Sequence, residues 1–161
     1  MKQRSKYFQL LVFLRLIKVT RNLTDNLTNE EKHMNYGMSR TIDRPFDEVN
    51  AEVRAALVEQ SFGIVSEIDM QATFQNKINV DIGPMIILGA CNPKYAYRAL
   101  QAEPSIGLLL PCNVVLRKTD VGVVVEMINP QMMAEITEGP EMKQIADEVT
   151  EMLSKALASL K

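Results

Sequence analysis

The stretch LGACNPKYAYRALQAEPSIGLLLPCN, residues 88–113, carries both cysteines of the chain, Cys91 and Cys112. Each cysteine lies beside an asparagine and a proline. Asn92 followed by Pro93 is typical of a helix start, with asparagine as the N-terminal cap and proline in the first turn. A helix is therefore expected after Cys91, and it connects the two cysteine motifs.

The segments around this helix have the spacing of strands. The apolar run over 85–90 predicts a buried strand that leads into Cys91. Pro104 ends the helix, because proline cannot continue it. The runs over 106–110 and 114–118 then predict one strand that is interrupted or bulged at Pro111.

The rest of the chain alternates strands and helices. We expect strands over 37–42, 64–68 and 122–128, a helix over 46–62 capped by Gly63, a short helix that is capped by Asp69 and runs through Ile78, a connection of uncertain form over 131–139, and a long amphipathic helix over 140–160. Thr119-Asp120 predicts the turn of a hairpin. This order predicts an α+β fold in which helices back a single sheet of mainly antiparallel strands.

Length and charge restrict the domain organisation and the partners. The 161 residues suffice for one domain with a sizeable core. The net charge of −2 favours neither nucleic acid nor an anionic membrane as a partner. Residues 1–33 hold seven Lys or Arg against three Asp or Glu, and the remainder holds eleven against seventeen. We therefore expect residues 1–33 to be a non-native or disordered extension and residues 34–161 to form the domain.

The residue types exclude several kinds of site. Two cysteines without a CxxC motif indicate neither a disulfide framework nor a zinc site, so a reducing cytoplasm is expected. His33 is the single histidine, and it precedes the expected domain, which therefore lacks histidine acid–base chemistry. The ten methionines indicate an adaptable core or interface rather than a metal–thioether site. No metal and no cofactor are expected.

The blocks CNP at 91–93 and IGLLLPCNVV at 106–115 resemble the domain-of-unknown-function family 302, small bacterial and archaeal proteins without an established activity. The resemblance covers about residues 34–161. It implies a compact α+β fold akin to the sheet-and-helix arrangement of the TATA-binding protein, and a tendency to form homodimers. It supplies no catalytic residues.

The two thiols are the candidate reactive groups. Cys91 precedes a helix start, whose partial positive charge lowers a thiol pKa, and Lys94 adds a cation nearby. If the two cysteine strands are neighbours, the thiols and the amides of Asn92 and Asn113 meet at one rim of the sheet. The alternative is that both cysteines are small apolar filler in the core.

These residues support three hypotheses and do not decide whether the protein is an enzyme. The first is a homodimer that binds or relays a small ligand, a sulfur species or a redox equivalent at the Cys91/Cys112 rim, with Asn92, Lys94 and Asn113 as ligand-binding residues. The second is an enzyme that holds a small anionic substrate at the Asn92 helix start. The third is a structural or regulatory dimer with inert cysteines.

The dimer has an expected surface. Apolar residues of the C-terminal helix form more than one stripe, and the strand over 122–128 could leave an apolar sheet face open. We expect a homodimer interface on the order of 1,200 Å² or more in total. Tyr95 and Tyr97 are further candidates to line a pocket beside the cysteines.

Overall fold

The computed structural model describes residues 36–137 and 139–161. The extension expected over residues 1–33 lies outside the described residues. Within the described ranges, no helix is both long enough and apolar enough to cross a bilayer.

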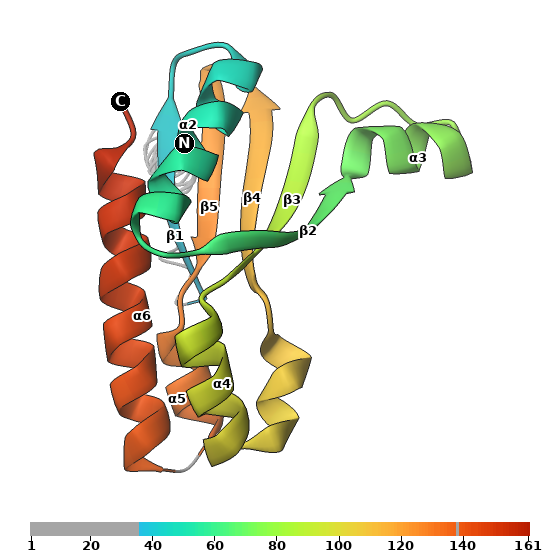
Figure 1. Ribbon diagram of the computed structural model, residues 1–161. Coiled ribbons are helices and arrows are strands. Elements are labelled where there is room, and N and C mark those ends of the chain that lie inside the picture. The colour runs from blue at the N-terminus through green and yellow to red at the C-terminus, as the bar shows by residue number, and fades with distance from the viewer. Residues whose placement is uncertain (1–35, 138) are drawn as a thin grey trace, which may run out of the picture. The chain divides into compact units, whose positions relative to one another are not determined.

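One five-stranded sheet organises the fold (Figure 1). Its strands are β1 (Gly37–Ile42), β2 (Gly63–Asp69), β3 (Met85–Cys91), β4 (Cys112–Thr119) and β5 (Gly122–Ile128). The order is β1-β5-β4-β3-β2, and every neighbouring pair is antiparallel. β2 to β5 therefore follow one another as a meander, and β1 joins β5 at the far edge. The predicted α+β fold is confirmed.

Helices cover one face and one end of this sheet. They are α2 (Phe46–Glu59), α3 (Met70–Ile78), α4 (Pro93–Ala102), the 3₁₀ helix η1 (Pro104–Leu109), α5 (Gln131–Ile136) and the long α6 (Pro140–Ser159). α2 and α6 pack against each other and against the sheet, while α4 and α5 pack on α6 beyond the ends of the strands (Figure 1). The predicted C-terminal helix is confirmed.

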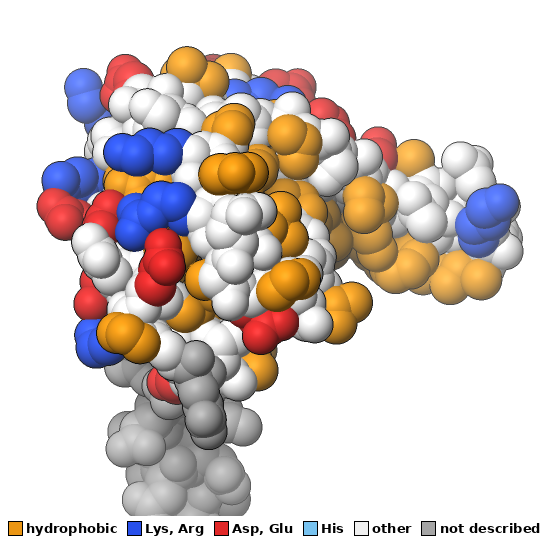
Figure 2. Space-filling view, turned by 60° about the horizontal axis from the view of Figure 1, so that its bottom comes forward, with side chains coloured by type: hydrophobic (Ala, Val, Ile, Leu, Met, Phe, Trp, Pro, Cys, Tyr) orange, Lys and Arg blue, Asp and Glu red, His pale blue; other side chains and the backbone are white. Residues whose placement is uncertain are grey.

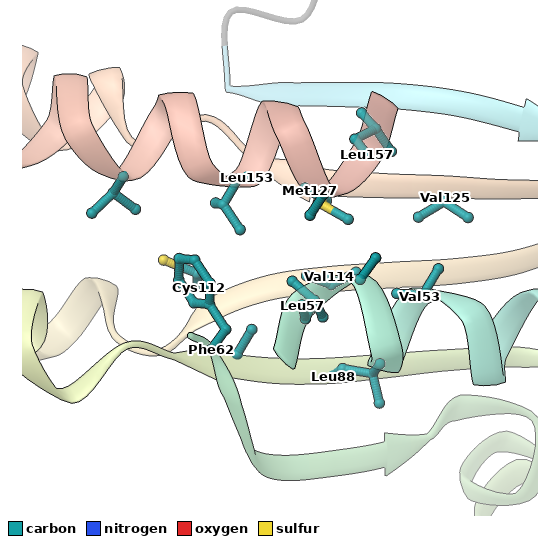
Figure 3. Close-up of a cluster of buried hydrophobic side chains, with 14 of the residues drawn as sticks. Val53, Leu57, Phe62, Leu88, Cys112, Val114, Val125, Met127, Leu153 and Leu157 are labelled. Carbon is teal, nitrogen blue, oxygen red and sulfur yellow. The ribbon is translucent and has the colours of Figure 1, made fainter. Parts of the chain in front are cut away.

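The core lies between the sheet and helices α2 and α6. Alternate residues of β4 and β5 point to it, as Val114 and Val125 show, because successive side chains of a strand face opposite sides. Leu57 of α2 and Leu153 of α6 meet them from the helix side (Figure 3).

The predicted bulged strand over 106–118 is partly wrong. Its first half is the helix η1, which begins after Glu103, whose carboxylate accepts a hydrogen bond of 2.9 Å from the Ser105 amide. Ile106 is buried and Leu108 is 89% exposed, so the apolar run spans the core and the surface. A cis Leu110–Pro111 peptide precedes β4, which begins cleanly at Cys112.

The end of α2 also differs from the prediction. The helix ends at Glu59, and Ser61 takes the left-handed conformation, with φ 63°, that we assigned to a glycine cap. Gly63 is instead the first residue of β2. The irregularity that we placed at Pro111 occurs in β2, where the register shifts between Ile64 and Ser66.

Gly89 allows a close approach beside this register shift. It lies on β3 opposite both Ser66 and Asn113. A Cβ atom at Gly89 would overlap Ser66 Oγ and lie 2.5 Å from Pro111 Cγ. Only glycine therefore fits between these two side chains.

Residues 68–84 form a projection that we call the arm. It contains the end of β2, α3 and the segment that returns to β3, and it extends away from the sheet (Figure 1). Asp69 caps α3 by accepting from the Ala72 amide at 2.8 Å, and Gln71 donates to Asp81 at 3.0 Å. No residue of α3 is buried. The arm is thus held by local hydrogen bonds and not by the core.

Candidate functional site

Strands β3 and β4 bring the two cysteines to one end of the sheet. They pair with Ala90 opposite Cys112, and Cys91 is the next residue of β3. Both thiols are free. The strands are therefore neighbours and both cysteines lie at the same end of the sheet, but Ala90 shares the face of Cys112, so the Cys91 side chain leaves its strand toward the other face.

A cavity of about 30 Å³ lies beside the two cysteines. It is lined mainly by apolar residues of the strand ends and of α4, α5 and α6: Phe62, Ala90, Cys91, Asn92, Tyr95, Ala96, Ala99, Leu110, Cys112, Pro130, Met133, Met142, Ile145, Ala146 and Val149. One water molecule needs about 10–15 Å³ of such space. The cavity therefore has room for very few heavy atoms.

Asn92 occupies the position predicted for it. Its side-chain oxygen accepts a hydrogen bond of 3.2 Å from the Lys94 amide, and Pro93 is the first residue of α4. Asn92 is 8% exposed and is the single buried polar residue of the described ranges. The cap is confirmed, and its oxygen already has a partner.

Lys94 contacts an aromatic ring, whereas the sequence predicted that it would act as a cation near the Cys91 thiol. Its ammonium lies 5.6 Å from the centre of the Tyr95 ring, a cation–π contact. Tyr95 in turn donates a hydrogen bond of 2.7 Å to Glu148 of α6, and Arg98 lies 3.6 Å from the same carboxylate. This hydrogen bond lowers the pKa of Glu148 and raises that of Tyr95. Tyr95 and Arg98 of α4 and Glu148 of α6 thus form a polar cluster between the two helices.

The expected lowering of the Cys91 pKa is wrong. Burial raises the pKa of the Cys91 thiol, because a thiolate loses solvation there. Burial raises the pKa of Cys112 to about 11, and the nearby Cys91 thiolate adds to this shift. Both thiols are therefore protonated at neutral pH.

Asn113 lies away from the cavity. It is exposed and pairs with Gly89, one position after Cys112 on β4. Since successive strand residues face opposite sides, the Asn113 side chain leaves the face that Cys112 occupies. The predicted meeting of both amides at one rim therefore does not occur.

Two methionines belong to the cavity wall although the sequence placed them only in a core or interface. Met133 comes from α5 and Met142 from the first turns of α6. The helical spacing of Met142 indicated burial, Met133 lay in the connection of uncertain form, and no sequence signal linked either residue to the cysteines. Of the two tyrosines considered, Tyr95 lines the cavity and Tyr97 is 67% exposed.

Comparisons with known proteins identify the family. The pattern described as "Domain of unknown function DUF302" matches residues 38–160. The chain is similar to the crystal structure of an uncharacterized conserved DUF302 protein from Bacillus stearothermophilus, with 24% identity, a TM-score of 0.73, and coverage of 78% of this chain and 98% of that one. Comparison with the curated proteins found no match. The match over nearly all described residues shows that this chain belongs to the DUF302 family.

Proposed function

We propose that this protein is a homodimeric binding protein that holds a small ligand in the cavity beside Cys91 and Cys112. The cavity carries the proposal, because residues of both cysteine motifs line it together with mainly apolar residues. Ligand sites are typically concave and mostly apolar, with few polar groups that fix orientation. Here the polar residues of the lining are the two cysteines, Asn92, whose side-chain oxygen accepts from the Lys94 amide, and Tyr95, whose hydroxyl donates to Glu148.

The ligand that suits this cavity is small, neutral and polarisable. The volume of about 30 Å³ limits it to one or very few heavy atoms. Burial keeps the thiols protonated, which disfavours a site built on a reactive thiolate. A neutral sulfur species such as dissolved hydrogen sulfide meets these conditions better than a redox equivalent relayed between thiolates.

The anionic-substrate enzyme has less support. It needs free donors at the start of α4, yet the Asn92 oxygen already occupies the Lys94 amide. Lys94 is also engaged with the Tyr95 ring. We therefore place binding ahead of catalysis at this site.

The exposed apolar residues that favour a homodimer lie on the arm and not on α6. The apolar face of α6, including Met142, Val149 and Leu160 beyond its end, is buried within the protomer. By contrast, hydrophobic side chains lie along one side of the projecting arm (Figure 2). They include Ile68, Ile78, Val80 and Ile82, which are 48%, 63%, 44% and 39% exposed. Such a patch is typical of a protein interface.

The open face of the sheet suits a second copy as the occupant. Ile87, Val115 and Val124 lie on the side of the sheet away from α2 and α6, outside the core cluster. A two-fold arrangement lets each protomer place its arm on the partner's open face, so both patches are covered at once. The arm supplies 17 residues, 68–84, and the open sheet face adds to them toward the about 20–30 residues that one side of a standard interface uses.

The ligand is tested on the full chain labelled with ¹³C at the methionine methyl groups. Dissolved hydrogen sulfide is the probe. We expect it to shift the methyl signals of Met133 and Met142, which line the cavity, and to leave that of Met127, which is buried elsewhere in the core. Absence of any shift at saturating sulfide would rule out the proposed site.

A filled-cavity variant controls this experiment. Ala146→Leu places a larger side chain in the cavity, so it should abolish the response to sulfide. Ala156→Leu crowds an equally buried position of the same helix that does not line the cavity. If both variants respond to sulfide as the wild type does, the ligand binds elsewhere and the proposal fails.

A further inference from the structure

Tyr95 of α4 belongs both to the cavity wall and to the surface of the protein. Most residues that line the cavity are buried, and four are only partly buried: Cys91, Tyr95, Ala96 and Leu110. A ligand that enters from solvent therefore has its shortest way past one of these four residues. Tyr95 is the aromatic residue among them, and its side chain is tied to a second helix.

The Tyr95 side chain is held at its ring and at its hydroxyl. The ammonium of Lys94 and the guanidinium of Arg98 each lie 5.6 Å from the centre of the ring. The hydroxyl donates a hydrogen bond of 2.7 Å to Glu148 of α6, and Arg98 lies 3.6 Å from the same carboxylate and 3.9 Å from that of Glu141. These contacts close the seam between α4 and α6 at Tyr95.

The same two helices otherwise line the cavity with small side chains. Ala96 and Ala99 come from α4, and Ala146 comes from α6. Alanine has no rotatable side chain that could block the space in place of the Tyr95 ring. Glu148 is partly exposed, with 35% of its side chain accessible, so water can replace the Tyr95 hydroxyl on the carboxylate.

We propose that Tyr95 is the gate residue of this cavity: its side chain rotates outward, the hydrogen bond to Glu148 breaks, and a small ligand passes between α4 and α6. This inference rests on the proposed binding function and adds the residue that controls entry and exit. The closed gate is the same with and without ligand. Loss of the hydrogen bond should therefore raise the rates of binding and release together and leave the equilibrium affinity unchanged.

Hydrogen peroxide measures access to the cavity of the full chain without its ligand. This small neutral molecule oxidises a methionine thioether to the sulfoxide and is itself reduced to water. Tyr95→Phe keeps the ring and removes the hydroxyl. Because a hydrogen bond to a charged group is lost, we expect the initial oxidation rates of Met133 and Met142 to rise about tenfold by peptide mass spectrometry. Met127, which is buried outside the cavity, should keep its rate.

Two further variants assign the effect to the hydrogen bond. Tyr97→Phe is the matched control, because Tyr97 is 67% exposed on the same helix and does not line the cavity, and it should leave all rates unchanged. Glu148→Ala removes the acceptor and should match Tyr95→Phe. The double variant should show no further rise, since both substitutions break the same bond. Equal rates for Tyr95→Phe and the wild type, or additive effects in the double variant, would overturn the inference.

Urea separates an open gate from a loss of stability. Rotation of one side chain exposes little surface, so the oxidation rate of Met142 in Tyr95→Phe should depend weakly on urea below the unfolding transition. A rate that rises with urea as steeply as the unfolding equilibrium constant would mean that Tyr95 only stabilises the fold. That result would also overturn the gate.

Failure of this inference and failure of the binding function are distinguishable. If sulfide shifts the signals of Met133 and Met142 but Tyr95→Phe changes neither their oxidation nor the exchange rate of sulfide, the ligand uses another entrance and the gate is overturned. If sulfide shifts neither signal while Tyr95→Phe speeds their oxidation, the gate stands and the binding function fails.

Discussion

Substitution of Ile78 on the arm tests the proposed dimer most directly. Ile78 is the last residue of α3 and is 63% exposed, and no residue of this helix is buried in the protomer. Ile78→Gln removes the apolar side chain and keeps a good helix former. The fold of the protomer should therefore be unaffected, and any change in association reports on the interface.

The magnitude follows from the exposed fraction. Full burial of an isoleucine contributes about 1.5–3 kcal/mol, so covering the exposed part of Ile78 contributes about 1–2 kcal/mol. A two-fold dimer contains two copies, which gives about 2–4 kcal/mol in total. We therefore expect Ile78→Gln to raise the dimer Kd roughly 30-fold to several hundred-fold.

Sedimentation velocity over a concentration series measures this Kd. Leu108→Gln is the control, because Leu108 is 89% exposed on η1, outside the arm. It should leave the Kd unchanged. A monomeric wild type at tens of micromolar, or an equal rise in Kd for both variants, would refute the reasoning.

Three further changes test the interior. Burial raises the pKa of Cys112 to about 11. Between the lower thiol pKa of the unfolded chain and pH 11, Cys112 is therefore deprotonated in the unfolded state and still protonated in the folded state. The free energy of unfolding should accordingly fall by about 2 kcal/mol between roughly pH 9 and pH 11, and chemical denaturation should show a smaller fall for Cys112→Ser. Asn92→Ala removes the cap of α4, and the same assay should show a loss of about 1 kcal/mol at pH 7. Gly89→Ala forces Ser66 and Pro111 apart; we expect a loss of about 1–3 kcal/mol, and a melting temperature equal to that of the wild type would contradict this packing.

The fold was largely predictable because local signals agreed with it. Asp69 and Asn92 cap helices where the sequence placed them, since each side chain finds a backbone amide within its own turn. The strand predicted over 106–110 was wrong, because apolar content alone does not distinguish a strand from a 3₁₀ helix. Ser61 took the left-handed position expected of a glycine, which no local rule required.

The site was less predictable because its properties arise from tertiary packing. Whether Cys91 and Cys112 lie at the same end of the sheet depended on which strands pair, and β3 and β4 do pair. The pKa of Cys91 depended on burial by elements far along the chain, and the local expectation from the helix start was wrong. Met133 joined the cavity through the packing of α5 on α6, which no spacing near the cysteines encodes.

The pairing of β1 has a consequence for the order in which the chain folds. β2 to β5 form a meander of strands that are neighbours in sequence as well as in space, whereas β1 pairs with β5, the last strand to be synthesised. Closing that long loop costs chain entropy before any of its contacts forms. We expect the meander to be structured in the folding transition state and β1 to join late, so substitutions in β1 should mainly speed unfolding rather than slow folding.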